Sequence, residues 1–178
     1  MIMKTAIKMF CTLLLGTTAL CAADAPKKNW TPPAHKIYAQ QLSDEIMAAH
    51  PELISLTVHG VPPGLSKVYT MFAGSFPERI GNPDDPDDVM VIEIGITILD
   101  PRWHRLKDPA KKFVMMMPLR DASGENCGLL VAAYKNAAFQ PNGSNAKLEA
   151  EFFAKGTKLR DELQKQIPSY EGLYAPAK

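Results

Sequence analysis

Two neighbouring apolar segments, 113–119 and 128–134, dominate the hydrophobic pattern of the chain. They flank a short polar stretch centred on Ser123 and Gly124, which is typical of the turn of a β-hairpin. Neither segment alternates apolar with polar residues, and a strand that is apolar on both faces has to be covered on both faces. The pattern therefore predicts a hairpin with one layer packed behind it and a second layer, of protein or ligand, in front.

Two amphipathic helices are predicted, one on each side of this strand-rich region. Over 34–50, apolar residues recur at helical spacing, and Pro51 ends the helix because proline lacks an amide donor. Over 146–167 the apolar stripe is longer, and Ser144 or Asn145 can cap it. The members of this stripe are Leu148, Phe152, Gly156, Leu159, Leu163 and Ile167. Both stripes need an apolar surface, and we expect them to pack on the back of the sheet.

Three further strands and a covering segment complete the predicted order. Residues 53–59 alternate apolar with polar positions, and 67–73 and 96–99 are short strand-like segments. The stretch 74–88 holds three prolines and two glycines, which makes it too irregular for a ladder strand. Residues 89–95 are predicted as a short helix capped by the preceding aspartates, lying over the sheet. The order indicates an α+β fold, an antiparallel sheet with helical cover.

This order resembles a known family of sensor domains. The element order, the Pro-Asp-Asp run before the short helix and the segment PLRDASGENCGLLVAAYK (118–135) are similar to the extracytoplasmic PAS-like domains called Cache domains, over roughly 34–167. The resemblance implies a PAS-like, Cache-like five-stranded antiparallel sheet with N- and C-terminal amphipathic helices and a covering loop. It also implies a small-molecule pocket between the sheet and the elements that link the second and third strands.

Two features differ from the membrane-bound sensors of that family. No apolar span follows Pro168, so the chain is not expected to signal across a membrane alone. Arg102 and Trp103 form an isolated pair, without the surrounding aromatic and acidic residues of the family's amino-acid-binding pattern.

The N-terminal segment has the pattern of a secretory signal peptide. Lys4 and Lys8 precede an apolar core, and small residues up to Ala23 are suited to cleavage. An uncleaved anchor is the alternative, although the apolar core is shorter than the roughly 20 residues that span a bilayer. We expect a periplasmic or secreted protein cleaved near Ala23, with disordered termini. Its expected parts are a signal peptide at 1–23, a linker at 24–33, a Cache-like domain at 34–168 and a C-terminal tail at 169–178.

Composition narrows the partners. With 20 Lys and Arg residues against 19 Asp and Glu residues the chain is almost neutral and has no basic stripe, so nucleic acid and anionic membranes are not expected as partners. Cys127 is the single cysteine after the predicted cleavage, which excludes an internal disulfide. Its place at the start of an apolar strand predicts a buried, inert thiol.

Strand alternation places a candidate site in front of the sheet. If Leu56 and Val58 pack on the helices, then Thr57 and His59 face the covering loop. Arg79 in that loop supplies a charge for an anionic ligand. The predicted ligand-binding residues are Thr57, His59, Tyr69, Met71, Arg79, Trp103, Met115 and Met117. A register error of one residue would send any of these side chains to the opposite face.

Motifs for catalysis or metal binding are missing from the sequence. It has no G-x-S-x-G, no phosphate-binding glycine loop, no H-E-x-x-H and no C-x-x-C-H. The run from Met115 to Met117 is a poor soft-metal site, because only alternate residues of a strand share a face. The aspartates between Asp84 and Asp88 lack the EF-hand spacing and are better explained as helix-capping residues. We expect no catalytic residue, no cofactor and no metal.

These observations predict an exported, sensor-type domain that binds a small organic ligand, with an anion as one candidate, and that presents it to a membrane receptor or another protein. The alternative is a periplasmic protein–protein interaction module with a filled core and no ligand, which docks through its helices or an exposed sheet edge.

Overall fold

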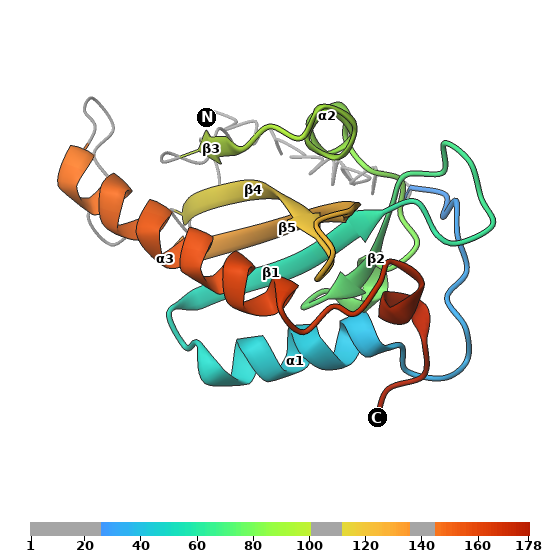
Figure 1. The fold of residues 1–178 in the computed structure, drawn as a ribbon. Helices are drawn as coiled ribbons and strands as arrows, with labels where there is room; N and C mark the ends of the chain where they lie inside the picture. Colours follow the sequence, from blue (N-terminus) through green and yellow to red (C-terminus); the bar gives the residue numbers. More distant parts are fainter. Residues whose placement is uncertain (1–25, 101–111, 136–144) are drawn as a thin grey trace, which may run out of the picture.

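The computed structural model describes residues 26–100, 112–135 and 145–178. These residues form a five-stranded antiparallel sheet in the order β2-β1-β5-β4-β3 (Figure 1). The strands are β1 (Leu53–Gly60), β2 (Thr70–Gly74), β3 (Ile98–Asp100), β4 (Lys112–Arg120) and β5 (Asn126–Lys135). The signal peptide predicted at 1–23 and the predicted site residue Trp103 lie outside the described residues.

Helices cover both faces of this sheet. The long helices α1 (Tyr38–Ala49) and α3 (Ala146–Gln164) lie on one face, and the short α2 (Pro86–Ile94) lies on the other (Figure 1). Two 3-10 helices, η1 (Pro77–Arg79) and η2 (Glu171–Tyr174), complete the order of elements. The predicted α+β fold, a five-stranded antiparallel sheet with N- and C-terminal helices and a covering segment, is confirmed. Within the described parts of the chain, no helix is long and apolar enough to cross a membrane.

The β4–β5 hairpin is buried on both faces, as its hydrophobic pattern predicts. Along β4 the side chains alternate between two apolar clusters. Phe113 and Leu119 belong to the cluster under α1 and α3. Val114 and Met116 belong to the cluster under α2. The hairpin therefore forms the floor of two separate packing layers.

Helix α3 packs on the sheet through its predicted stripe. Phe152, Gly156, Leu159 and Leu163 are all buried. The ring centroid of Phe152 lies 4.9 Å from that of Phe113, in a stacked arrangement. The backbone N–H of Leu148 donates to the side-chain oxygen of Asn145 at 3.1 Å, so Asn145 caps the helix as predicted.

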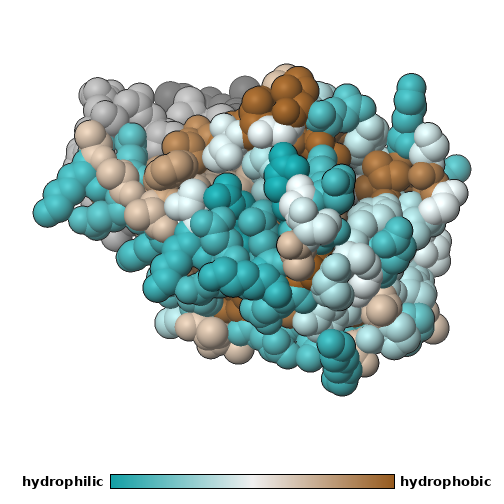
Figure 2. All heavy atoms as spheres, in the orientation of Figure 1, coloured by the Kyte–Doolittle hydropathy of each residue, from teal (hydrophilic) through white to brown (hydrophobic). Residues whose placement is uncertain are grey.

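Helix α2 begins earlier than the predicted 89–95. Asp85 is its N-cap and forms a capping box with Asp88, and Pro86 occupies the first turn, where its missing N–H costs nothing. Gly95 ends the helix with a φ of 75°, in the left-handed region. Figure 2 shows a hydrophobic group at the top of the molecule over α2, where Met90 and Ile94 are exposed, and hydrophilic side chains along the outer face of α3.

Residues near both ends of the described chain contact the domain, so the expectation of disordered termini is wrong for the residues that make these contacts. Leu173 in η2 is buried, and the Ala175 carbonyl accepts from the Tyr38 N–H at 2.8 Å, at the start of α1. On the N-terminal side, the Asn29 N–H donates to the Gly81 carbonyl at 2.8 Å. The packed unit is therefore wider than the predicted domain at 34–168.

Cys127 is a buried free thiol, in agreement with its predicted inert character. Its Sγ donates to the Leu119 carbonyl at 3.4 Å. Burial raises the pKa of the Cys127 thiol to about 12, so little reactive thiolate forms at neutral pH.

Two glycines of the hairpin provide a matched test of its packing. Gly124 and Gly128 both have positive φ, 92° and 137°. A Cβ at Gly128 would lie 2.1 Å from the His59 carbonyl oxygen, whereas nothing lies within 4 Å of one at Gly124. We expect Gly124→Ala to lower the free energy of unfolding by about 1 kcal/mol through backbone strain, and Gly128→Ala by at least about 3 kcal/mol because β1 and β5 must separate. Urea unfolding followed by circular dichroism measures both, and equal losses would contradict this packing.

Candidate functional site

A cavity of about 610 Å³ lies between the sheet and the segment that carries η1 and α2. Small-molecule pockets typically have roughly 300–1,000 Å³, so this cavity has room for a small organic molecule. Its floor consists of side chains from the front of β1, β4 and β5, namely Ser55, Thr57, His59, Val114, Met116, Val131 and Ala133. Its walls come from the covering segment, from β3 and from the start of β4, namely Phe76, Arg79, Asp85, Pro86, Asp87, Asp88, Ile98, Leu99, Asp100 and Lys112.

Small side chains in the floor explain why this face is not filled. Ser55 and Ala133 are directly opposite each other in the β1–β5 register, and Val114 lies opposite Ala133 on the next strand. Helix α2 packs through Val91 and Ile92 on the apolar cluster of this face. The row of small and medium side chains beside that contact leaves open volume.

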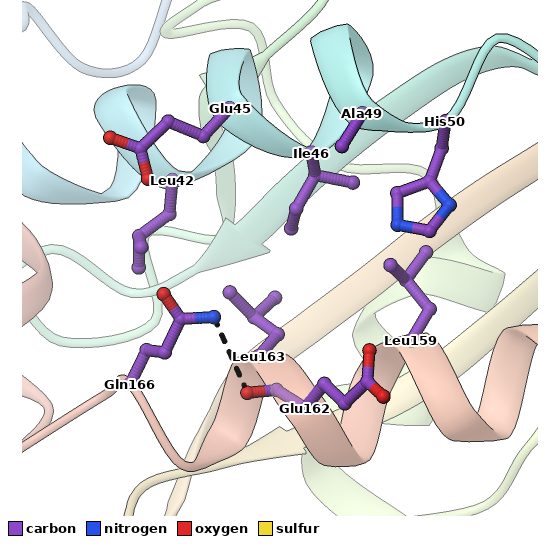
Figure 3. A pocket seen from close by; sticks show the side chains of 9 residues that line it. All are labelled: Leu42, Glu45, Ile46, Ala49, His50, Leu159, Glu162, Leu163 and Gln166. Carbon is purple, nitrogen blue, oxygen red and sulfur yellow. Dashed lines mark hydrogen bonds between the residues drawn. The ribbon is translucent and has the colours of Figure 1, made fainter.

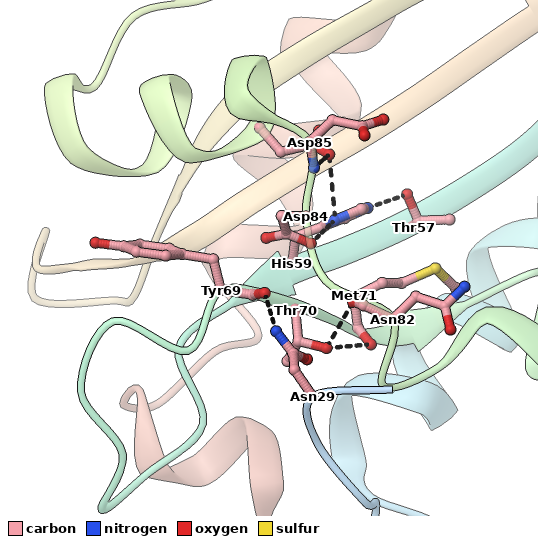
Figure 4. A network of polar contacts seen from close by, with 10 residues as sticks. Asn29, Thr57, His59, Tyr69, Thr70, Met71, Asn82, Asp84 and Asp85 are labelled. Carbon is pink, nitrogen blue, oxygen red and sulfur yellow. Dashed lines mark hydrogen bonds and ion pairs between the residues drawn. The ribbon is translucent and has the colours of Figure 1, made fainter. Parts of the chain in front are cut away.

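His59 joins the sheet to the covering segment, as Figure 4 shows. Its Nδ1 lies 2.7 Å from Asp84 Oδ1 and its Nε2 lies 2.7 Å from Thr57 Oγ1. Asp88 Oδ2, from the first turn of α2, lies 3.9 Å from the same Nδ1. The Asp84 side chain is 0% exposed and that of His59 is 7% exposed. A buried polar chain of Thr57, His59 and Asp84 thus runs from β1 to the covering segment.

Burial controls the protonation of the two carboxylates in this cluster. It raises the pKa of Asp84, although the hydrogen bond with His59 acts in the opposite direction. It also raises the pKa of Asp88 to about 6, opposed by attraction to His59 and reinforced by repulsion from Asp84. The charged form of this cluster is therefore costly unless a cation lies close to both carboxylates.

The remaining charges of the cavity are mostly acidic. Asp85, Asp87 and Asp100 line its outer part, together with Arg79 and Lys112. The guanidinium carbon of Arg79 lies 5.4 Å from the centroid of the Phe76 ring, as a cation–π contact. Since Asp88 adds a fourth carboxyl group, carboxyl groups outnumber Lys and Arg side chains among the lining residues that the structure describes, which suits a ligand with a positively charged group.

The structure brings three of the predicted site residues together at the cavity, namely Thr57, His59 and Arg79. Two others are near this region and do not line it. The Tyr69 hydroxyl donates to Glu93, and Met71 is buried with its backbone bonded to Gly81 and Asn82. Figure 4 shows Tyr69, Thr70 and Met71 at the start of β2, beside Asn29 and Asn82. The predicted location of Tyr69 and Met71 in the cavity wall is therefore wrong.

Met115 and Met117 lie on the opposite face of the sheet from the cavity, so their predicted location is also wrong. Both are completely buried in the cluster under α1 and α3. Gly156 of α3 makes room for Met115, because a Cβ at this glycine would lie 2.2 Å from the Met115 Sδ. Met116, which points the other way, is the methionine that lines the cavity.

The site contains acidic residues whose role the sequence did not reveal. Asp84 and Asp88 were expected only as helix-capping residues, yet both lie beside His59, 25 residues away along the chain in the case of Asp84. The sequence signal for this site was His59, the single histidine on the polar face of β1. Only the tertiary fold brings it to the aspartates.

A second hollow lies between α1 and α3, on the other side of the sheet. Figure 3 shows its lining of Leu42, Ile46 and Leu163 together with polar side chains such as Glu162 and Gln166. Its volume is about 210 Å³, which is below the usual range for small-molecule sites. The cavity in front of the sheet is the stronger candidate.

Known proteins offer little further guidance. No family model and no curated protein matches the chain. Among solved structures, the sensor domain of DcuS from E. coli is similar over 54% of this chain, with 14% sequence identity and a TM-score of 0.38. The chain spans 65% of that domain, less than two thirds of its length. At this identity and TM-score, the likeness assigns neither a family nor a ligand to this protein.

The raised pKa of Asp88 has a consequence for stability that can be measured. A carboxyl group with a pKa of about 6 in the folded state and an ordinary value of 3.8 binds its proton more tightly in the folded state. Its contribution to stability is complete below pH 4 and is lost as the pH rises through 6. Asp88→Asn keeps the acceptor for the Asp85 N–H and removes the charge. We therefore expect this variant to gain up to about 3 kcal/mol over the parent between pH 4 and pH 7.

Asp161→Asn is the control, since Asp161 is an exposed carboxylate on α3, on the other face of the sheet. Chemical unfolding of the three proteins from pH 4 to pH 7, in buffers with EDTA so that no divalent ion neutralises the carboxylates, measures the difference. If the free energies of unfolding of the parent and Asp88→Asn change with pH in parallel, the charge of Asp88 does not destabilise the folded state.

Proposed function

We propose that the protein is an exported, sensor-type binding domain that holds a small organic molecule in the cavity in front of its sheet and performs no chemistry on it. The observation that carries this proposal is the cavity itself, about 610 Å³ in volume, with apolar residues of β4 and β5 in its floor and charged groups in its walls. Such a combination fixes the orientation of a ligand through a few polar groups while apolar contacts supply most of the binding energy. The signal-like N-terminal sequence supports a periplasmic or secreted location.

The distribution of charge supports a particular ligand class. An amine on the ligand would meet Asp85 and Asp87, and an apolar body would lie on Val131 and Met116. Arg79 remains a partner for a carboxylate, which was the group expected from the sequence. We therefore propose a small amine, with a carboxylate as an additional feature of the ligand.

The alternative is an interaction module with a filled core, and the open cavity argues against it. A ligand that binds only the folded state raises its apparent stability, by about 2.7 kcal/mol when its concentration is 100 times the dissociation constant. A thermal-shift screen of small amines, carboxylates and amino acids, on exported protein in EDTA buffer, therefore separates the two functions. We expect amines to raise the melting temperature, and no shift with any compound would favour the interaction module.

Two variants locate any ligand found in this screen. Ala133→Leu adds three carbon atoms to the floor of the cavity, so it should remove the shift for every ligand while the unliganded domain remains folded. Arg79→Ala should remove the part of the shift that depends on a carboxylate in the ligand. Arg160→Ala is the matched control, because Arg160 lies on α3 and pairs with Asp161 at 2.8 Å. A ligand whose shift survives Ala133→Leu does not bind in this cavity.

A further inference from the structure

Three side chains at one end of the cavity direct potential metal ligands toward one another. His59, Asp84 and Asp88 each offer one ligand atom, and these atoms all lie within 4.8 Å of one another. The residues come from three different places, β1, the covering segment and the first turn of α2, so only the folded domain assembles them. All three side chains are buried or almost buried, with exposures of 7%, 0% and 12%.

The Asp84 carboxylate needs more positive charge than its protein neighbours supply. Its Oδ1 contacts His59, whereas its Oδ2 is buried without a hydrogen-bond partner among the described residues. A buried carboxylate oxygen without a partner is costly, and buried charges in proteins are normally paired or bound to metal ions. The neighbouring Asp88 carboxylate increases this requirement.

In the tautomer that carries its proton on Nε2, the His59 ring can serve as a metal ligand. When Nε2–H donates to Thr57 Oγ1, at 2.7 Å, the lone pair of Nδ1 points to Asp84 Oδ1, also at 2.7 Å. Two acceptors at that distance repel each other unless a cation lies between them. Metal-binding histidines usually donate their second ring N–H to a neighbouring acceptor, which is the role that Thr57 would have here.

The distances are compatible with an ion after small movements. A tetrahedral ion about 2.0–2.1 Å from each ligand separates neighbouring ligand atoms by about 3.3 Å. The distances from His59 Nδ1 are 2.7 Å to Asp84 Oδ1 and 3.9 Å to Asp88 Oδ2, so one must open and the other must close. Each of these two changes is about half an ångström by this comparison, and the third pair of ligand atoms, on Asp84 and Asp88, lies within 4.8 Å.

We propose that His59 Nδ1 and the carboxylates of Asp84 and Asp88 bind one divalent first-row metal ion of the Zn²⁺, Co²⁺ or Mn²⁺ type. One imidazole and two carboxylates suit these ions, whereas Cu(I) prefers sulfur and Ca²⁺ takes more oxygen ligands. Because His59 and Asp88 also line the cavity, a free coordination position would face it. The sequence predicted no metal, because these ligands follow no spacing motif. The proposal does not depend on an organic ligand in the cavity.

The metal alone is the probe. Protein treated with EDTA and dialysed is titrated with Co²⁺, followed by its visible absorption, and with Zn²⁺ and Mn²⁺, followed by calorimetry and melting temperature. We expect one equivalent of ion to bind and to raise the melting temperature. His59→Ala and Asp84→Asn should each weaken binding by about 100-fold or more.

Matched controls separate loss of the site from loss of the fold. Asp161→Asn removes a carboxylate from α3, on the other face of the sheet, and His50→Gln removes a histidine that lies 3.2 Å from a glutamate, Glu52, on the other side of the domain. Both should bind like the parent. The melting temperature of each metal-free variant shows whether it is folded, and Asp88→Asn provides a second ligand variant if Asp84→Asn is not. The proposal is overturned if none of the three ions binds the parent, or if folded ligand variants bind as tightly as the controls.

Discussion

The structure depends on one constraint, which is that the β4–β5 hairpin must be covered on both faces. Side chains of the hairpin belong alternately to two apolar clusters, one under α1 and α3 and one under α2. The first cover is long and aromatic, with Phe152 stacked on Phe113. The second cover is short and packs mainly through Val91 and Ile92. The cavity exists because the cover by α2 is much shorter than the cover by α1 and α3. A single short helix cannot fill the space above a row of small floor residues.

Polar contacts hold the shorter cover in place. His59 is buried between Thr57 of its own strand and Asp84 of the covering segment. The capping box of Asp85 and Asp88 fixes the start of α2 next to this contact. Burying such groups costs free energy unless each group is paired. This cost is concentrated at the end of the cavity where these groups lie. The cavity thus combines apolar floor residues of β4 and β5 with a strongly polar end.

Local sequence patterns were sufficient for the elements and insufficient for the site. The spacing of the apolar residues predicts the helices and strands because burial of one face determines it. Which face of β4 meets the cavity depends on pairing with β5 and on Gly156 of α3, so Met115 and Met117 were placed on the wrong side. The proximity of His59 to Asp84 arises only from the fold. The small side chains of Ser55 and Ala133 indicate open volume. That they lie opposite each other on neighbouring strands follows only from the β1–β5 register, which the sequence does not reveal.

The central claim is that the face of the sheet under α2 is an open, ligand-sized cavity and not a filled core. A crystal structure of the protein tests it most directly. The account predicts that α2 stands off the sheet over Ser55 and Ala133, with ordered density for a bound molecule or water in the space between Thr57 and Asp87. A structure in which the covering segment packs directly on Val131 and Ala133, with no volume left between them, would contradict it.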